Sequence, residues 1–112
     1  MDKTIFIEKM KSNVSFTEEE QLEIRKISIE RAGIDLSAVI AMEELAELQQ
    51  EVSKQIRKKG DYYDLLQEIA DAYVNIANLE YMFHITKADV EKAINVKIQQ
   101  TKERYDEQTK IY

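Results

Sequence analysis

The stretch AMEELAELQQEVSKQI, residues 41–56, decides the fold of this chain. Its apolar residues recur at intervals of four, three, four and four, which places them on one face of an α-helix. These residues are Ala41, Leu45, Leu48, Val52 and Ile56. The pattern predicts a helix that starts near residue 35 or 37 and runs to about residue 59. Basic residues fill its last turn, and Gly60 is predicted to end it.

The sequence after Gly60 predicts a second helix that folds back on the first. Asp61 can cap its start, and the helix is expected to run to about His84. Its apolar stripe consists of Leu65, Ile69, Ala72, Ile76, Leu79 and Phe83. Because so few residues separate the two helices, we expect them to pack as an antiparallel hairpin.

Capping motifs predict one further helix on each side of the hairpin. Thr17 and Glu20 form a capping box for a helix that ends at Gly33, and Thr86 can cap a last helix. The expected inner face of that last helix consists of Val90, Ala93, Ile94, Lys97, Ile98 and Thr101. Residues 1–15 carry no clear pattern, and residues 106–112 are predicted to fray. The chain is therefore predicted to be one all-α domain over residues 1–112, a four- to five-helix antiparallel bundle.

Composition narrows the possible functions. The chain has 112 residues, no proline and two glycines, which favours helix, and it has no cysteine, which excludes disulfides and thiolate metal sites. It has no apolar run near the roughly 20 residues that span a bilayer, and its start is too charged for a secretory signal. The net charge of -6 argues against nucleic acid or an anionic membrane as partner. We expect a cytoplasmic protein.

Two acidic pairs are the strongest functional signal. Glu44 and Glu47 lie three residues apart on the first helix of the hairpin, and Glu68 and Asp71 lie three apart on the second. Each pair therefore shares a helical face beside the apolar stripe. If these faces meet, they present four hard oxygen ligands, which suit Mg²⁺ or Mn²⁺.

A structural interpretation of the same acids stays open at this point. Charged residues that flank an apolar stripe are common in helical bundles, where they are solvated or pair between helices. Such flanks usually mix the two signs. Here the positions beside the core, 44, 47, 51, 64, 68 and 71, are all acidic.

The two acidic segments resemble a known family. Glu43-Glu44-Leu45-Ala46-Glu47-Leu48 followed by Glu68-Ile69-Ala70-Asp71-Ala72 is similar to the EExxE…ExxD signature of the MazG-like, all-α nucleoside triphosphate pyrophosphohydrolases. The resemblance covers about residues 30–105. It differs at Ala70 and at Leu45-Ala46, where many members carry a glycine or another small residue.

The resemblance implies Mg²⁺-dependent hydrolysis of a nucleoside triphosphate to the monophosphate and pyrophosphate, in nucleotide-pool housekeeping. It also implies that Glu44, Glu47, Glu68 and Asp71 are the metal ligands. A carboxylate that the metal does not saturate can take a proton from the attacking water, and we assign this role to Glu44 or Glu47.

Basic and amide side chains are the candidates for holding the substrate. Lys97 is the first candidate for the pyrophosphate group, followed by Lys54, Lys58 and Arg104. Asn75 and Asn78 continue the acidic strip and can contact phosphate, ribose or base; they can equally form a hydrogen-bonded polar edge.

Two other functions remain as alternatives. One is an enzyme like phosphoribosyl-ATP pyrophosphohydrolase, and the other is a non-catalytic helical interaction module. In each case a homodimer or homotetramer is expected, because apolar residues outside the main stripes suggest a second buried face. These residues are Ile40, Tyr73, Val74 and Ala77.

Overall fold

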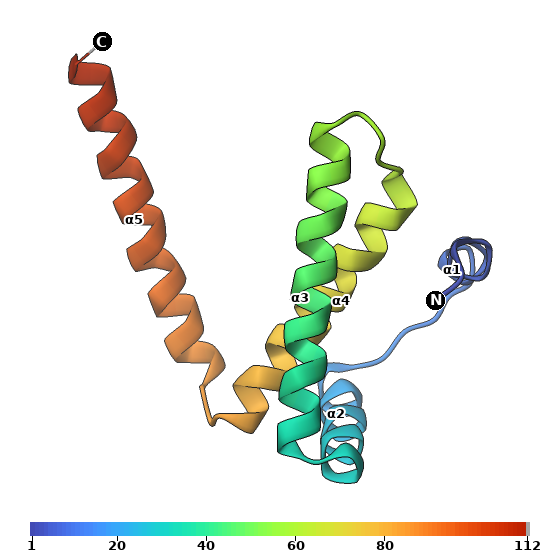
Figure 1. Ribbon diagram of the computed structural model, residues 1–112. Coiled ribbons are helices and arrows are strands. Elements are labelled where there is room, and N and C mark those ends of the chain that lie inside the picture. Colours follow the sequence, from blue (N-terminus) through green and yellow to red (C-terminus); the bar gives the residue numbers. More distant parts are fainter. Residues whose placement is uncertain (112) are drawn as a thin grey trace.

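The computed structural model describes residues 1–111 and contains five α-helices, with no strand among those residues (Figure 1). The all-helical prediction is therefore confirmed. The helices are α1 (Lys3–Met10), α2 (Glu18–Ala32), α3 (Ile34–Ile56), α4 (Tyr62–Met82) and α5 (Lys87–Ile111).

Helices α3 and α4 form the predicted hairpin, and they make the most extensive contact in the chain (Figure 1). The Asp61 side chain caps α4, since its carboxylate accepts hydrogen bonds from the backbone N–H groups of Tyr63 and Asp64 at 2.9 and 3.1 Å. Two small core residues, Ala41 of α3 and Ala72 of α4, are buried. Small side chains let two helices approach closely, so this hairpin holds facing residues in a fixed register.

The end of α3 differs from the prediction. The helix stops at Ile56, and Lys58, rather than Gly60, takes the left-handed conformation with φ 61°. The N–H of Lys59 then donates to the carbonyl of Lys54 at 2.9 Å, which closes the helix end. Gly60 has a steric role instead, because a Cβ there would lie within 2.5 Å of two atoms of the Gln55 amide.

Helix α2 begins and ends as the sequence predicts. Thr17 Oγ1 accepts a hydrogen bond from the N–H of Glu20 at 3.1 Å, and the Glu20 carboxylate accepts one from the N–H of Thr17 at 2.9 Å. Gly33, at φ 88°, joins α2 directly to α3. A residue with a side chain is strained at this φ, so glycine permits the abrupt change of direction. Ile29 of α2 is buried, and α2 contacts both α3 and α4.

Helix α1 lies within residues 1–15, a segment without a clear sequence pattern. The Asp2 carboxylate caps it by accepting from the N–H groups of Thr4 and Ile5. Lys3 pairs with Asp61 and Asp64 at the start of α4, at 3.5 and 3.6 Å. These pairs join two regions far apart in the sequence, and local periodicity does not reveal them.

Helix α5 points away from the other four helices (Figure 1). Its expected inner face is exposed except for the half-buried Val90, so the predicted antiparallel packing of this helix does not occur within the single chain. The helix continues through Ile111, across most of the span that was predicted to fray, and Tyr112 lies outside the described residues. Across the described part of the chain, every helix is too short or too polar to cross a membrane.

Candidate metal centre

Three carboxylates from the two helices of the hairpin converge at the edge of the core. Glu44 of α3 and Glu68 and Asp71 of α4 each place a carboxylate oxygen within 4.8 Å of the other two. The one-sided acidic strips on α3 and α4 make this possible, because antiparallel packing turns the two strips toward each other. The meeting predicted for these three residues is therefore present in the structure.

The pKa values of two of these groups are raised by burial and by the neighbouring negative charges. Burial, followed by the charges of Glu47, Asp71, Glu44 and Glu51, raises the pKa of Glu68 from 4.5 to about 6. Burial also raises the pKa of Glu44, followed by the effects of Glu47 and Asp71. Both shifts favour the protonated form in the absence of a cation, since like charges in a partly desolvated site disfavour ionisation.

Two buried carboxylate oxygens in this region lack any hydrogen-bond partner. These are Oε2 of Glu68 and Oε2 of Glu51. A buried oxygen without a partner is destabilising, and native structures rarely tolerate one without a bound water or ion. Glu51 lies in the acidic strip of α3 and Glu68 in that of α4, so the unsatisfied acceptors coincide with the excess of negative charge.

The donor set fits a hard divalent cation. All of the converging groups are carboxylates, and oxygen-only sites suit Mg²⁺ or Mn²⁺ rather than the softer metals. Two ligands of one Mg²⁺ lie at most about 4.2 Å apart, because each is about 2.1 Å from the ion. The observed spread of up to 4.8 Å therefore requires only small side-chain rotations.

Glu47 and Glu51 complete the acidic surface around the three carboxylates. Glu47 is exposed and does not belong to the converging group, although its charge is the largest electrostatic contribution to the raised pKa of Glu68. Glu51 belongs to the acidic strip of α3 but is not among the ligands that the sequence predicts. Its half-buried carboxylate and unpartnered oxygen place it at the site.

The two candidate asparagines are already engaged. Asn75 is buried one turn from Asp71, and its Nδ2 donates to the backbone carbonyl of Asp71 at 2.9 Å. Asn78 Oδ1 accepts from Nε of Arg25 on α2 at 2.8 Å. The sequence did not single out Arg25, because nothing in its local pattern marks a contact with a residue 53 positions away. Both asparagines thus act first as positioning groups on the polar edge.

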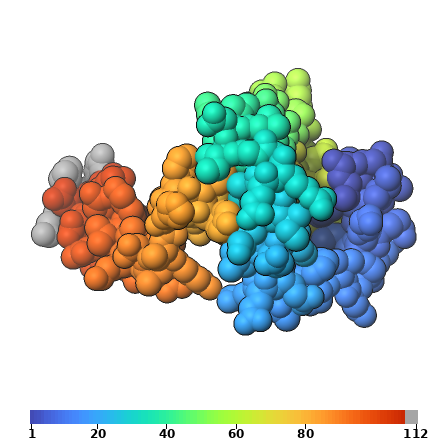
Figure 2. Space-filling view, turned by 90° about the horizontal axis from the view of Figure 1, so that it is seen from below, coloured from blue at the N-terminus to red at the C-terminus, as the bar shows by residue number. Residues whose placement is uncertain are grey.

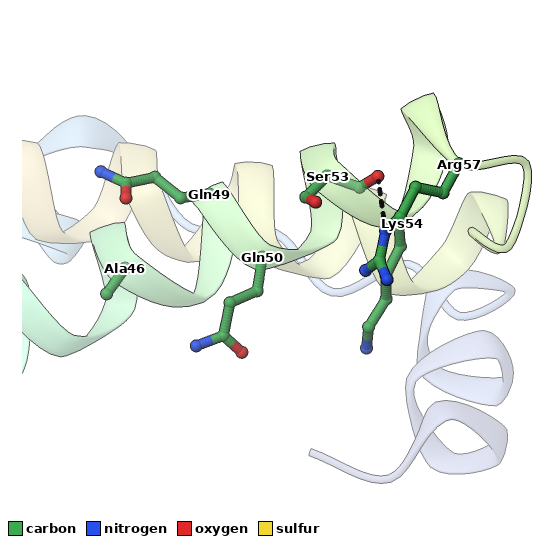
Figure 3. Close-up of a pocket in the computed structure, with 6 residues that line it drawn as sticks. All are labelled: Ala46, Gln49, Gln50, Ser53, Lys54 and Arg57. Atoms are coloured by element: carbon green, nitrogen blue, oxygen red, sulfur yellow. Dashed lines mark hydrogen bonds between the residues drawn. The ribbon is translucent and has the colours of Figure 1, made fainter.

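Of the candidate lysines on α3 and its turn, Lys54 lies next to the acidic strip. Its Nζ pairs with Glu51 Oε1 at 3.0 Å. Figure 3 shows Lys54 and Arg57 beside a shallow depression of about 410 Å³ along α3, where Nε of Arg57 donates to the carbonyl of Ser53. Lys58 is exposed in the following turn. Lys54 is therefore the one of these two lysines with an observed link to the strip.

The structure does not bring the two candidates on α5 to the carboxylates within one chain. Lys97 and Arg104 are exposed on α5, which points away from α3 and α4. Lys97 Nζ donates to Gln100 Oε1 on its own helix at 3.3 Å.

Comparisons of this chain with family models, with curated proteins and with solved structures gave no match.

Proposed function

We propose that this protein is a Mg²⁺-dependent nucleoside triphosphate pyrophosphohydrolase, built on an all-α fold of the MazG-like type. The observation that carries the proposal is the convergence of Glu44, Glu68 and Asp71, from two helices, beside buried carboxylate oxygens without partners. The resemblance of the two acidic segments to the family signature agrees with that geometry. Mn²⁺ is an alternative metal on the same chemistry.

The proposed roles of the residues follow from their positions. Glu44, Glu68 and Asp71 would hold the cation, with Glu47 as the fourth ligand that the signature implies. A bound divalent cation would neutralise the phosphate charges and polarise an attacking water. A triphosphate carries about four negative charges, and without a cation the acidic strip would repel it.

Glu47 is the group best placed to accept a proton from water. It is exposed and lies outside the converging carboxylates, so one of its oxygens stays free to accept a proton when the other binds the cation. Lys54, beside Glu51, is the nearest candidate on the hairpin for contact with a phosphate oxygen. Asn75 would hold the backbone at Asp71 and so keep that carboxylate in position.

The test is pyrophosphate release from a panel of canonical and modified nucleotides, including phosphoribosyl-ATP, with Mg²⁺ or Mn²⁺. We expect activity for the wild type and a loss of at least about 100-fold for Glu47→Gln, the size expected for removal of a general base. Glu23→Gln, the same change at an exposed position of α2, should keep full activity. Absence of pyrophosphate release from every nucleotide would contradict the proposal.

A further inference from the structure

The single chain leaves far more surface exposed than a compact protein of its size. Its accessible surface is 9323 Å², whereas a compact monomer of 13.2 kDa exposes about 6,400 Å². Its radius of gyration is 17.5 Å, against about 13 Å for a compact domain of this length. The excess of about 2,900 Å² is several times the roughly 800 Å² that each partner buries in a stable interface.

Helix α5 contributes several of the exposed apolar side chains. Ile94, Val96 and Ile98 are 53%, 56% and 62% exposed. Ile94 and Ile98 continue the line of Val90 at intervals of four, so they share one face, whereas Val96 lies on the opposite face. Most helical stability in proteins comes from packing of an amphipathic face, so burial of this face is the expected source of stability for the 25-residue helix.

That face of α5 lines a wide groove. The groove has a volume of about 790 Å³ and is bounded by α2, α4 and the start of α5. Figure 2, a view from below, shows an open notch between the start of α5 (orange) and α2 (blue). Apolar side chains dominate its walls, among them the 72% exposed Tyr73 and the 44% exposed Ile76 of α4. The groove and the exposed face of α5 are therefore parts of one continuous apolar surface.

We propose that this groove holds α5 of a second copy of the chain, in a reciprocal exchange. Each copy would insert its α5 between the α5 and the α4 of the other, so that α4 and α5 of both copies form a four-helix arrangement. Because the exchange is reciprocal, the two copies would form a closed, two-fold interface. The length of α5, about 37 Å for 25 residues, matches the length of α4, about 31 Å for 21 residues.

A matched pair of substitutions on α5 tests this geometry. Ile94 and Val96 are almost equally exposed in the single chain, so Ile94→Lys and Val96→Lys should affect an isolated chain alike. Only Ile94 lies on the face that the second copy would cover. Sedimentation at tens of micromolar should show a dimer for the wild type and for Val96→Lys, and a monomer for Ile94→Lys. Circular dichroism of each variant checks that the helices remain folded.

A cross-link identifies the surfaces in contact. The chain has no cysteine, so single cysteines can be introduced without competing thiols. A mixture of Tyr73→Cys and Ile94→Cys should form, on oxidation, a disulfide-linked species of about 26 kDa, twice the 13.2 kDa chain. Mixing Tyr73→Cys with Val96→Cys should give much less of this product.

Three outcomes would overturn the proposal. A wild-type monomer would contradict the exchange, and a radius of gyration near 13 Å in solution would then mean that α5 closes onto the groove of its own chain. A dimer that both lysine variants retain, or that both lose, would mean that this face of α5 does not define the interface. Open-ended assembly with rising concentration would exclude a closed reciprocal exchange. None of these readouts depends on catalysis, so the proposed activity can stand or fall separately.

Discussion

At the scale of single residues, the acidic strip opposes folding unless a cation is bound. Glu44, Glu68 and Asp71 approach within 4.8 Å, and two nearby carboxylate oxygens have no partner. A ligand that binds only the folded chain stabilises it by mass action, while removal of one charge relieves repulsion directly. Function and stability therefore make opposite demands on the same side chains.

Asp71→Asn tests this opposition. In the presence of a chelator, we expect the variant to be more stable than the wild type by up to about 1 kcal/mol, because it removes one of several like charges. Mg²⁺ should raise the melting temperature of the wild type and leave that of Asp71→Asn almost unchanged. Thermal melts with and without Mg²⁺ measure both effects. Glu23→Gln should respond to Mg²⁺ as the wild type does, and an equal response from Asp71→Asn would argue against a metal centre.

The raised pKa of Glu68 predicts the pH dependence of the metal-free chain. The pKa rises from 4.5 to about 6 on folding, so the folded state binds more protons between these values. The free energy of unfolding should then fall as pH rises from about 4.5 through 6, and level off above. Urea titrations in chelator across this range measure the slope. Glu68→Gln should flatten the slope, and a wild-type chain that gains stability over the same range would contradict the assignment.

At the scale of helices, the sequence predicted the capped ends well because capping is local. The Thr17 box, the Asp61 cap and the bond from the N–H of Asp89 to Thr86 Oγ1 all lie within three residues. Helix α1 was missed since its anchor, Lys3, pairs with residues about 60 positions away. The predicted end of α3 was wrong, because glycine is the usual left-handed residue at a helix end, whereas here Lys58 takes that conformation instead of Gly60.

The turn after α3 gives a prediction with two opposite signs. Lys58→Gly should stabilise the chain by about 1 kcal/mol, because glycine adopts φ 61° without the cost that a side chain incurs. Gly60→Ala should destabilise it, since the new Cβ would displace the Gln55 amide from its bond to the carbonyl of Asp61. Urea unfolding of both variants measures the two changes. Two shifts of the same sign would contradict these separate roles.

At the scale of the whole molecule, the sequence predicted the α3–α4 hairpin but not the direction of α5. Two amphipathic helices joined by a short turn have few ways to pack, so the register of the acids followed from periodicity. The inner face predicted for α5 is exposed in the single chain, apart from the half-buried Val90. Periodicity cannot say whether such a face meets its own chain or another, because both bury the same surface.

A concentration dependence should follow from the exposed α5. If two copies fold around a shared interface, the unfolding midpoint should rise with protein concentration, because dissociation accompanies unfolding. Melts of the wild type at about 1 and 100 μM should differ by several degrees, and those of Ile94→Lys should coincide. A wild-type midpoint that stays constant over this range would contradict a folded dimer.

The attachment of α1 has a consequence for the response to ionic strength. Lys3 pairs with two carboxylates that are 43% and 40% exposed. Salt shortens the screening length from about 10 Å at 0.1 M to about 3 Å at 1 M, so concentrated salt weakens the two ion pairs of Lys3. The half-buried Phe6 and Ile7 would then hold α1 alone. Trypsin should cut after Lys11 faster in molar salt than in dilute buffer. This cut would release residues 1–11, which contain α1, while the α3–α4 hairpin stays intact.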